Sequence, residues 1–203
     1  MIVYVESNFV LELALVQEQH EICDQILRVC EAGVSRLVLP AFSMMEPLET
    51  IRRHEVTRRR AKNALEDEIK QLARTAIYQE RLRDVEPVLE LLVQSSDEDL
   101  QRLASIRSRL LACAELIPLE GSILAQAEEH QEDYDLSPQD AVIYASVLAH
   151  RRISGEPGCF VTRDRDFDDL EIKRELRSYN CKLLSNFATG YQFLRGLYSE
   201  ESP

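Results

Sequence analysis

Acidic side chains stand directly beyond two short apolar segments of the chain. Glu6 follows IVYV (2–5), and Asp164 lies two residues beyond CFVT (159–162). Short apolar runs rich in β-branched residues are typical of strands buried in a parallel sheet. Because ligands of an open parallel sheet bind outside the carboxyl ends of its strands, both acids are candidates for one shared site.

Two more acids are expected at the same edge. Glu46 lies six residues after the end of the apolar segment RLVLP (36–40), and Asp140 stands in the first turn of a helix expected over 138–152. Gathered carboxylates repel each other unless they face water, cap a helix or hold a cation. We therefore interpret the four acids as a site for a hard divalent cation, Mg²⁺ or Mn²⁺.

Each acid also has a purely structural interpretation. Ser137, followed by Pro138 and Asp140, has the spacing of an N-terminal capping box. Glu46 has the same spacing from the serine at position 43, although Pro47 favours a helix that begins at the proline. Glu6 and Asp164 have the positions of ordinary loop or turn residues.

Beyond Asp164, the segment RDRDFDDL (163–170) carries three further aspartates. Asp166 is a candidate for outer support of the cation site. Asp168 and Asp169 are expected to cap or precede a short helix over about 170–177. The histidines lack the spacing of metal ligands, so zinc is not expected.

Strand-like and helical segments alternate along the chain without hairpin turn signals. This order predicts a single α/β domain over 1–203, a three-layer α/β/α fold with a parallel sheet. A long helical stretch without glycine is too large for an ordinary crossover, and we expect it to form a helical insertion over about 52–114. Within it, Ser96 and Asp99 predict a helix start by their capping-box spacing.

The net charge of −12 argues against a general affinity for nucleic acid, but it leaves local basic patches open. The stretch IRRHEVTRRRAK (51–62) is such a patch, and an RNA backbone could bind its arginines, Arg52, Arg53, Arg59 and Arg60. The alternative is a solvated helix, because at 100° per residue the basic side chains of this stretch point in three directions.

Five widely spaced cysteines, none in a C-x-x-C pair, predict free thiols in a reducing compartment. The first residues lack the basic region of a signal peptide, and no apolar run approaches the length of a membrane span. We expect a cytoplasmic protein without a membrane partner. Apolar stripes of leucine and isoleucine lie at helical spacing, at 65, 69 and 72 and again from 100 to 111. We expect them to pack the two insertion helices on each other and on the core, and the excess of apolar side chains also predicts a homodimer.

Four segments together, IVYVESNFV, LPAFSMMEP, SPQDAVIYASVLAH and CFVTRDRDF, resemble the PIN-domain family of metal-dependent ribonucleases. The resemblance covers residues 1–50 and 116–195 and leaves the helical middle unexplained. It implies an RNA substrate and a divalent metal cofactor. Since the family includes toxin ribonucleases, an antitoxin-like protein is a candidate partner.

By this resemblance the catalytic acids would be Glu6, Glu46, Asp140 and Asp164, with Glu6, Asp140 and Asp164 as metal ligands. Asn8 and Thr162 match polar positions that support the site, with Asp166 outside them. The first acid of the family is usually aspartate, and the extra methylene of Glu6 changes its reach. The rival hypothesis is a catalytically degenerate module whose helical insertion binds a protein.

Overall fold

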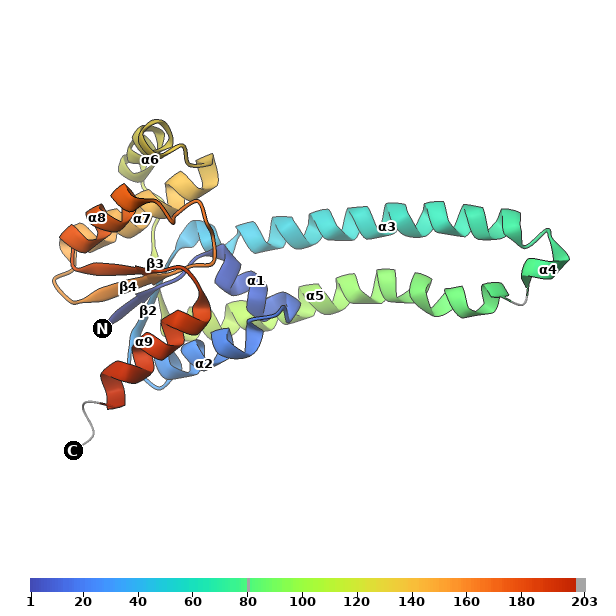
Figure 1. Cartoon of the computed structure of the whole chain (residues 1–203), viewed down its shortest axis with the longest axis horizontal. Coiled ribbons are helices and arrows are strands. Elements are labelled where there is room, and N and C mark those ends of the chain that lie inside the picture. The colour runs from blue at the N-terminus through green and yellow to red at the C-terminus, as the bar shows by residue number, and fades with distance from the viewer. Residues whose placement is uncertain (80, 200–203) are drawn as a thin grey trace.

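A computed structural model of the chain describes residues 1–79 and 81–199 (Figure 1). Within these residues a five-stranded, all-parallel sheet has the strand order β3-β2-β1-β4-β5. The strands are β1 (Ile2–Tyr4), β2 (Arg36–Pro40), β3 (Ala114–Ile117), β4 (Gly158–Val161) and β5 (Cys181–Leu184). The chain leaves β1 toward β2 on one side and later adds β4 on the other, so the order of the strands reverses beside β1.

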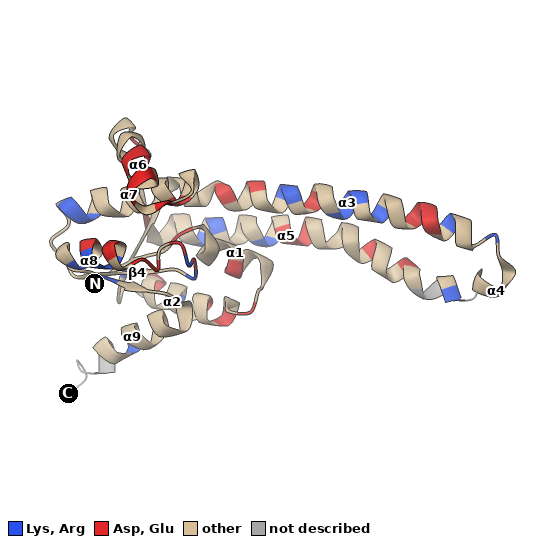
Figure 2. Ribbon diagram, turned by 45° about the horizontal axis from the view of Figure 1, so that its top comes forward, with Lys and Arg blue, Asp and Glu red and all other residues tan. Residues whose placement is uncertain are grey.

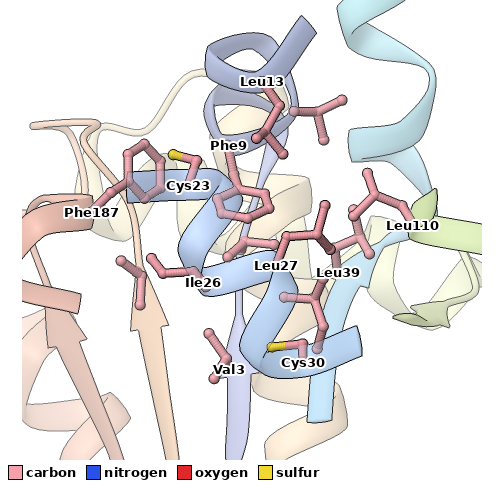
Figure 3. Packing of buried hydrophobic residues seen from close by; sticks show 14 of the residues in the cluster. Val3, Phe9, Leu13, Cys23, Ile26, Leu27, Cys30, Leu39, Leu110 and Phe187 are labelled. Atoms are coloured by element: carbon pink, nitrogen blue, oxygen red, sulfur yellow. The ribbon is translucent and has the colours of Figure 1, made fainter. Parts of the chain in front are cut away.

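Helices cover both faces of the sheet, which confirms the predicted three-layer α/β/α fold. One layer contains α1 (Ser7–Leu15), α2 (His20–Glu31) and α9 (Phe187–Ser199), and the other contains α6 (Gly121–Tyr134), α7 (Pro138–Ile153) and α8 (Leu170–Ser178). Successive residues of a strand point to opposite faces. Accordingly Val3 packs in the first layer with Phe9 and Phe187 (Figure 3), whereas Ile2 and Tyr4 pack in the second.

The helical middle of the chain forms a long hairpin that projects from the domain (Figure 1). After a 3-10 turn, η1 (Ala41–Met44), the hairpin consists of α3 (Glu46–Leu72), α4 (Ala76–Gln79), η2 (Arg81–Val85) and α5 (Glu86–Cys113). Leu103, Ile106 and Leu110 of α5 are buried in the core beside α1 and α2. Only the inner part of the hairpin therefore shares the core of the domain.

Charged contacts clamp the base of the hairpin to the first helical layer. The Nε of Arg102 donates a hydrogen bond to the carbonyl oxygen of Ala14 at 2.9 Å. Arg109 contacts Asp24 at 2.7 Å and Glu31 at 2.8 Å, both on α2. These contacts fix the direction in which the hairpin leaves the domain.

The helix start predicted from Ser96 and Asp99 is wrong, because α5 runs through both residues without a break. Asp99 is buried and forms ion pairs with Arg58 of α3 at 2.7 Å and with Arg102, three residues along α5, at 2.5 Å. Its carboxylate thus ties the two long helices together. The S-x-x-D spacing is typical of a capping box, but here the aspartate lies inside the helix and points across to the neighbouring helix.

Among the described residues, no helix combines the length and the apolar character needed to cross a bilayer. The five cysteines are free thiols, as predicted. Burial raises the pKa of the Cys159 thiol, and the same cause raises that of Cys23. Both thiols therefore stay protonated and pack as small apolar side chains.

Exposed apolar side chains on the outer part of the hairpin generate a prediction about assembly. Leu72, Ile77, Val88 and Leu91 are 44%, 74%, 51% and 61% exposed. A helix of 27 residues is about 40 Å long, so two such helices side by side present a face of roughly 800 Å², the area each partner buries in a standard interface. We expect the hairpins of two copies to pack on each other.

Light scattering tests this expectation with matched variants of α5. Leu91 and Leu111 are both 61% exposed, but Leu111 lies at the base of the hairpin. Wild type and Leu111→Glu should scatter as dimers, and Leu91→Glu as a monomer, because a buried unpaired carboxylate opposes association. A wild-type mass near 23.4 kDa at high protein concentration would rule the dimer out.

Candidate active site

The sheet brings Glu6 and Asp164 together at its carboxyl edge. Strands β1 and β4 are neighbours in parallel register, with Tyr4 opposite Phe160, and each acid lies just beyond its strand. The side-chain amide of Asn8 donates to Oδ2 of Asp164 at 3.4 Å. Two of the predicted site acids therefore share the point at which the strand order reverses, the usual position of a ligand in such sheets.

Glu6 is the N-cap of α1 and is only 2% exposed. Its Oε2 accepts the backbone N–H of Asn8 at 2.6 Å, and its Oε1 accepts the hydroxyl of Thr162 at 2.9 Å. The pKa of Glu6 is raised to about 8. Burial is the largest cause, the two hydrogen bonds oppose it, and the nearby charges of Asp164 and Glu46 add to it. Two of the other predicted acids are therefore close enough to affect the pKa of Glu6.

Thr162 links the two strand ends through one hydroxyl group. The hydroxyl donates to Glu6, and its oxygen accepts the backbone N–H of Asp164 at 2.9 Å. Oδ1 of Asp164 in turn accepts the backbone N–H of Asp166 at 3.1 Å, while the side chain of Asp166 is exposed. Asn8 and Thr162 therefore orient acids of this edge.

Glu46 is the first residue of α3 and reaches back to α1, where its Oε2 accepts the hydroxyl of Ser7. Ser43 lies buried in the 3-10 turn, and the cap position of α3 is Met45 without a side-chain cap bond, so the S-x-x-E spacing is not used here. The role of Ser7 was not predicted, although its position directly after Glu6 could have suggested it.

Asp140 combines both interpretations given to it. Ser137 caps α7 by accepting the backbone N–H of Asp140 at 3.2 Å, and it donates its own hydroxyl to Oδ2 of Asp140 at 2.5 Å. Burial raises the pKa of Asp140, and the charges of Asp164, Asp166 and Glu46 raise it further. Asp140 is therefore both part of the helix cap and one of the four acids, Glu6, Glu46, Asp140 and Asp164, that form what we call the acid edge.

The carboxylates fit a hard cation that keeps most of its waters better than a cation held entirely by protein ligands. Within residues 1–79 and 81–199, no three carboxylate, histidine or cysteine side chains lie close enough to hold one ion together. Mg²⁺ keeps several waters and is typically held by one or two carboxylates. Glu6 is only 2% exposed, whereas Asp164, Asp140 and Glu46 are partly exposed, so these three are the more accessible donors.

The predicted basic residues of α3 have different surroundings. Arg52, Arg53, Arg59 and Arg60 are all exposed. Arg59 forms an ion pair with Glu55 at 2.9 Å. Arg52 and Arg53 border a cleft that also contains Glu46. Of the four arginines, these two lie next to the acid edge.

This arrangement of four acids at the edge of a parallel sheet agrees with the comparison to known families. The family model of the PIN domain matches residues 3–167. The chain belongs to the PIN-domain family. Proteins of this family are generally nucleases and typically use divalent metal ions. Comparison with curated proteins and with solved structures gave no match for the chain.

A buried ion pair that the sequence did not predict anchors the loop that carries Asp164. Glu12 of α1 is fully buried, and its Oε1 contacts Arg163, the residue before Asp164. Its Oε2 accepts the backbone N–H of Gln19 at 2.9 Å, and the side chain of Gln19 accepts the backbone N–H of Phe187 at 3.2 Å. One buried carboxylate thus joins three loops beneath the acid edge.

The buried pair makes a stability prediction. Arg163→Met leaves Glu12 as an uncompensated buried charge, which should destabilise the protein by about 3 kcal/mol in urea unfolding. Arg165→Met is the matched control, because the side chain of Arg165 is exposed in the same loop.

The double variant Glu12→Gln/Arg163→Met removes the stranded charge and should recover part of the loss. Equal unfolding midpoints for Arg163→Met and Arg165→Met would show that the pair does not hold the loop.

Proposed function

We propose that this PIN domain is a metal-dependent endoribonuclease that hydrolyses RNA phosphodiester bonds. The observation that carries the proposal is the convergence of four acids from four distant segments, Glu6, Glu46, Asp140 and Asp164, at the edge beside β1 and β4. Burial is the largest cause of the raised pKa values of Glu6 and Asp140, and the charges of at least two other acids add to each, a pattern typical of functional sites.

A bound divalent ion would neutralise charge on the scissile phosphate and supply an activated water. Asp164 and Asp140 are the residues best placed to hold it, because both are partly exposed at the edge. Glu46 is near enough for its charge to raise the pKa of Asp140, and its carboxylate can orient a water. Glu6 is buried behind these residues, and hydrogen bonds from Thr162 and Asn8 keep its carboxylate in one orientation.

Hydrogen bonds from neighbouring residues keep the carboxylates of the acid edge in fixed orientations. Thr162 fixes the backbone of Asp164, and Ser137 fixes the carboxylate of Asp140. Ser7 restrains Glu46 from the side of α1. Pre-set ligands of this kind lower the reorganisation needed when a substrate phosphate and a cation meet.

A second candidate function is a catalytically inactive PIN domain that works by binding protein. It is favoured by the complete hydrogen bonding of both Glu6 oxygens and by the spacing of the acids, which brings no three of them into contact among the described residues. In that case the hairpin would carry the function, first of all by binding a second copy. A toxin-like role with an antitoxin-like partner stays a prediction of the family relationship.

Cleavage of a mixed single-stranded RNA pool under saturating Mg²⁺ or Mn²⁺ separates the two functions. Glu6→Gln keeps the shape but removes the charge, so cleavage and metal affinity should fall about 10- to 100-fold. Glu6→Asp keeps the charge and matches the usual residue of the family, so it should retain activity. Asp164→Asn is the inactive control.

Two results would count against the proposed nuclease. Wild-type protein that leaves the RNA intact with either ion would favour the binding module. Full activity in Glu6→Gln would remove residue 6 from the site and leave three acids to account for cleavage. Thermal melting of each variant shows whether a loss of activity reflects a loss of fold.

A further inference from the structure

A cleft of about 380 Å³ opens beside Glu46, between the start of α3 and the first turn of α7. This volume lies within the range of pockets that bind small ligands. The cleft adjoins the acid edge on both sides, because Gln139, which lines it, directly precedes Asp140. Its other walls include Phe42, Met45, Arg52 and Arg53.

The cationic wall of the cleft is available for a ligand. In the described part of the chain, neither Arg52 nor Arg53 lies within ion-pair distance of a carboxylate, and Arg53 makes one long hydrogen bond, to Thr50 at 3.4 Å. Arg59, two turns further along α3, is neutralised by Glu55 instead. Figure 2 shows the same alternation of basic and acidic residues along α3. Unpaired charge is thus kept next to the cleft.

The apolar wall of the cleft is available as well. Phe42 is half-buried, with part of its ring packed on the second core cluster, and Met45 is 55% exposed. Arg107 of α5 reaches the sulfur of Met45 at 3.7 Å, which adds a third arginine at this rim. An aromatic face beside arginines is the combination that binds an unstacked base together with its phosphate.

We propose that this cleft binds the nucleotide next to the scissile phosphate of a single-stranded RNA. Arg52 and Arg53 contact the phosphate of that nucleotide, and its base stacks against Phe42. Gln139 lies where its amide can hydrogen-bond the edge of the base. The inference rests on the proposed function, since the acid edge that borders the cleft would cut the neighbouring bond.

The composition of the cleft favours a single strand over a duplex. In an A-form duplex the bases stay stacked and paired, so none can reach a wall formed by Phe42 and Met45. Glu49, one helical turn before Arg53 on α3, also lines the cleft.

Binding measurements in a cleavage-deficient background test the cleft separately from catalysis. Anisotropy of a short labelled single-stranded RNA is followed with Asp164→Asn protein over a series of salt concentrations. Adding Arg52→Ala and Arg53→Ala should weaken binding at low salt by about 10-fold or more. It should also reduce the slope of log affinity against log salt by roughly 0.7, since each phosphate neutralised on a single strand contributes about 0.7.

Matched variants control for charge and for the aromatic contact. Lys70→Ala with Arg74→Ala removes the same charge from the outer end of the hairpin and should leave affinity and slope unchanged. Phe42→Leu keeps an apolar side chain and should cost about 5-fold, the lower end of a lost base stack. A duplex of the same sequence should bind no better to wild type than to the Arg52/Arg53 variant.

The outcomes distinguish this inference from the nuclease itself. Loss of binding in the Arg52/Arg53 variant alone supports the cleft, even if wild type cuts no RNA. Equal affinity and slope in the Arg52/Arg53 and Lys70/Arg74 variants would overturn it, even if wild type is an active nuclease. Binding of an acidic peptide in place of RNA would also overturn it and make the cleft a protein site.

Discussion

The cost of burying the Glu6 carboxyl next to a second acid, at the ends of β1 and β4, is the constraint around which the acid edge is built. Parallel pairing of these strands forces Glu6 and Asp164 to the same edge, and burial makes the charge of Glu6 costly. The protein offsets part of this cost with the backbone N–H of Asn8 and with the Thr162 hydroxyl, both of which donate to the Glu6 carboxylate. A divalent cation bound at this edge would cancel the remaining repulsion between the carboxylates.

The same edge is connected mechanically to the rest of the molecule. Arg163 fastens the loop of Asp164 to the buried Glu12, so the loop is anchored one residue away from the site. Glu46 is the first residue of α3, and the base of that hairpin is held by Asp99 and by Arg109. The long hairpin therefore leaves the domain from a rigid base that includes a site residue.

Much of this was predictable from the sequence because local physics marks it. Buried parallel strands appear as short apolar runs, Pro138 and Ser137 mark the start of α7, and the acids beyond the strands indicate the edge. The role of Asp99 was mispredicted, because its spacing from Ser96 matches that of a cap, while one of its two ion-pair partners, Arg58, is 41 residues away. The Glu12–Arg163 pair and the cleft beside Glu46 also join segments far apart in the chain, and no local pattern reports such contacts.

The central claim is that the acid edge holds a divalent cation, and calorimetric titration with Mg²⁺ and Mn²⁺ tests it most directly. Wild type should release or absorb heat on binding, and Asp164→Asn should abolish that heat. Asp168→Asn is the matched control, because Asp168 lies in the same loop but pairs with Lys173 at 2.5 Å, and it should bind as wild type does. Absence of binding by wild type at millimolar ion, or equal binding by all three proteins, would contradict the account.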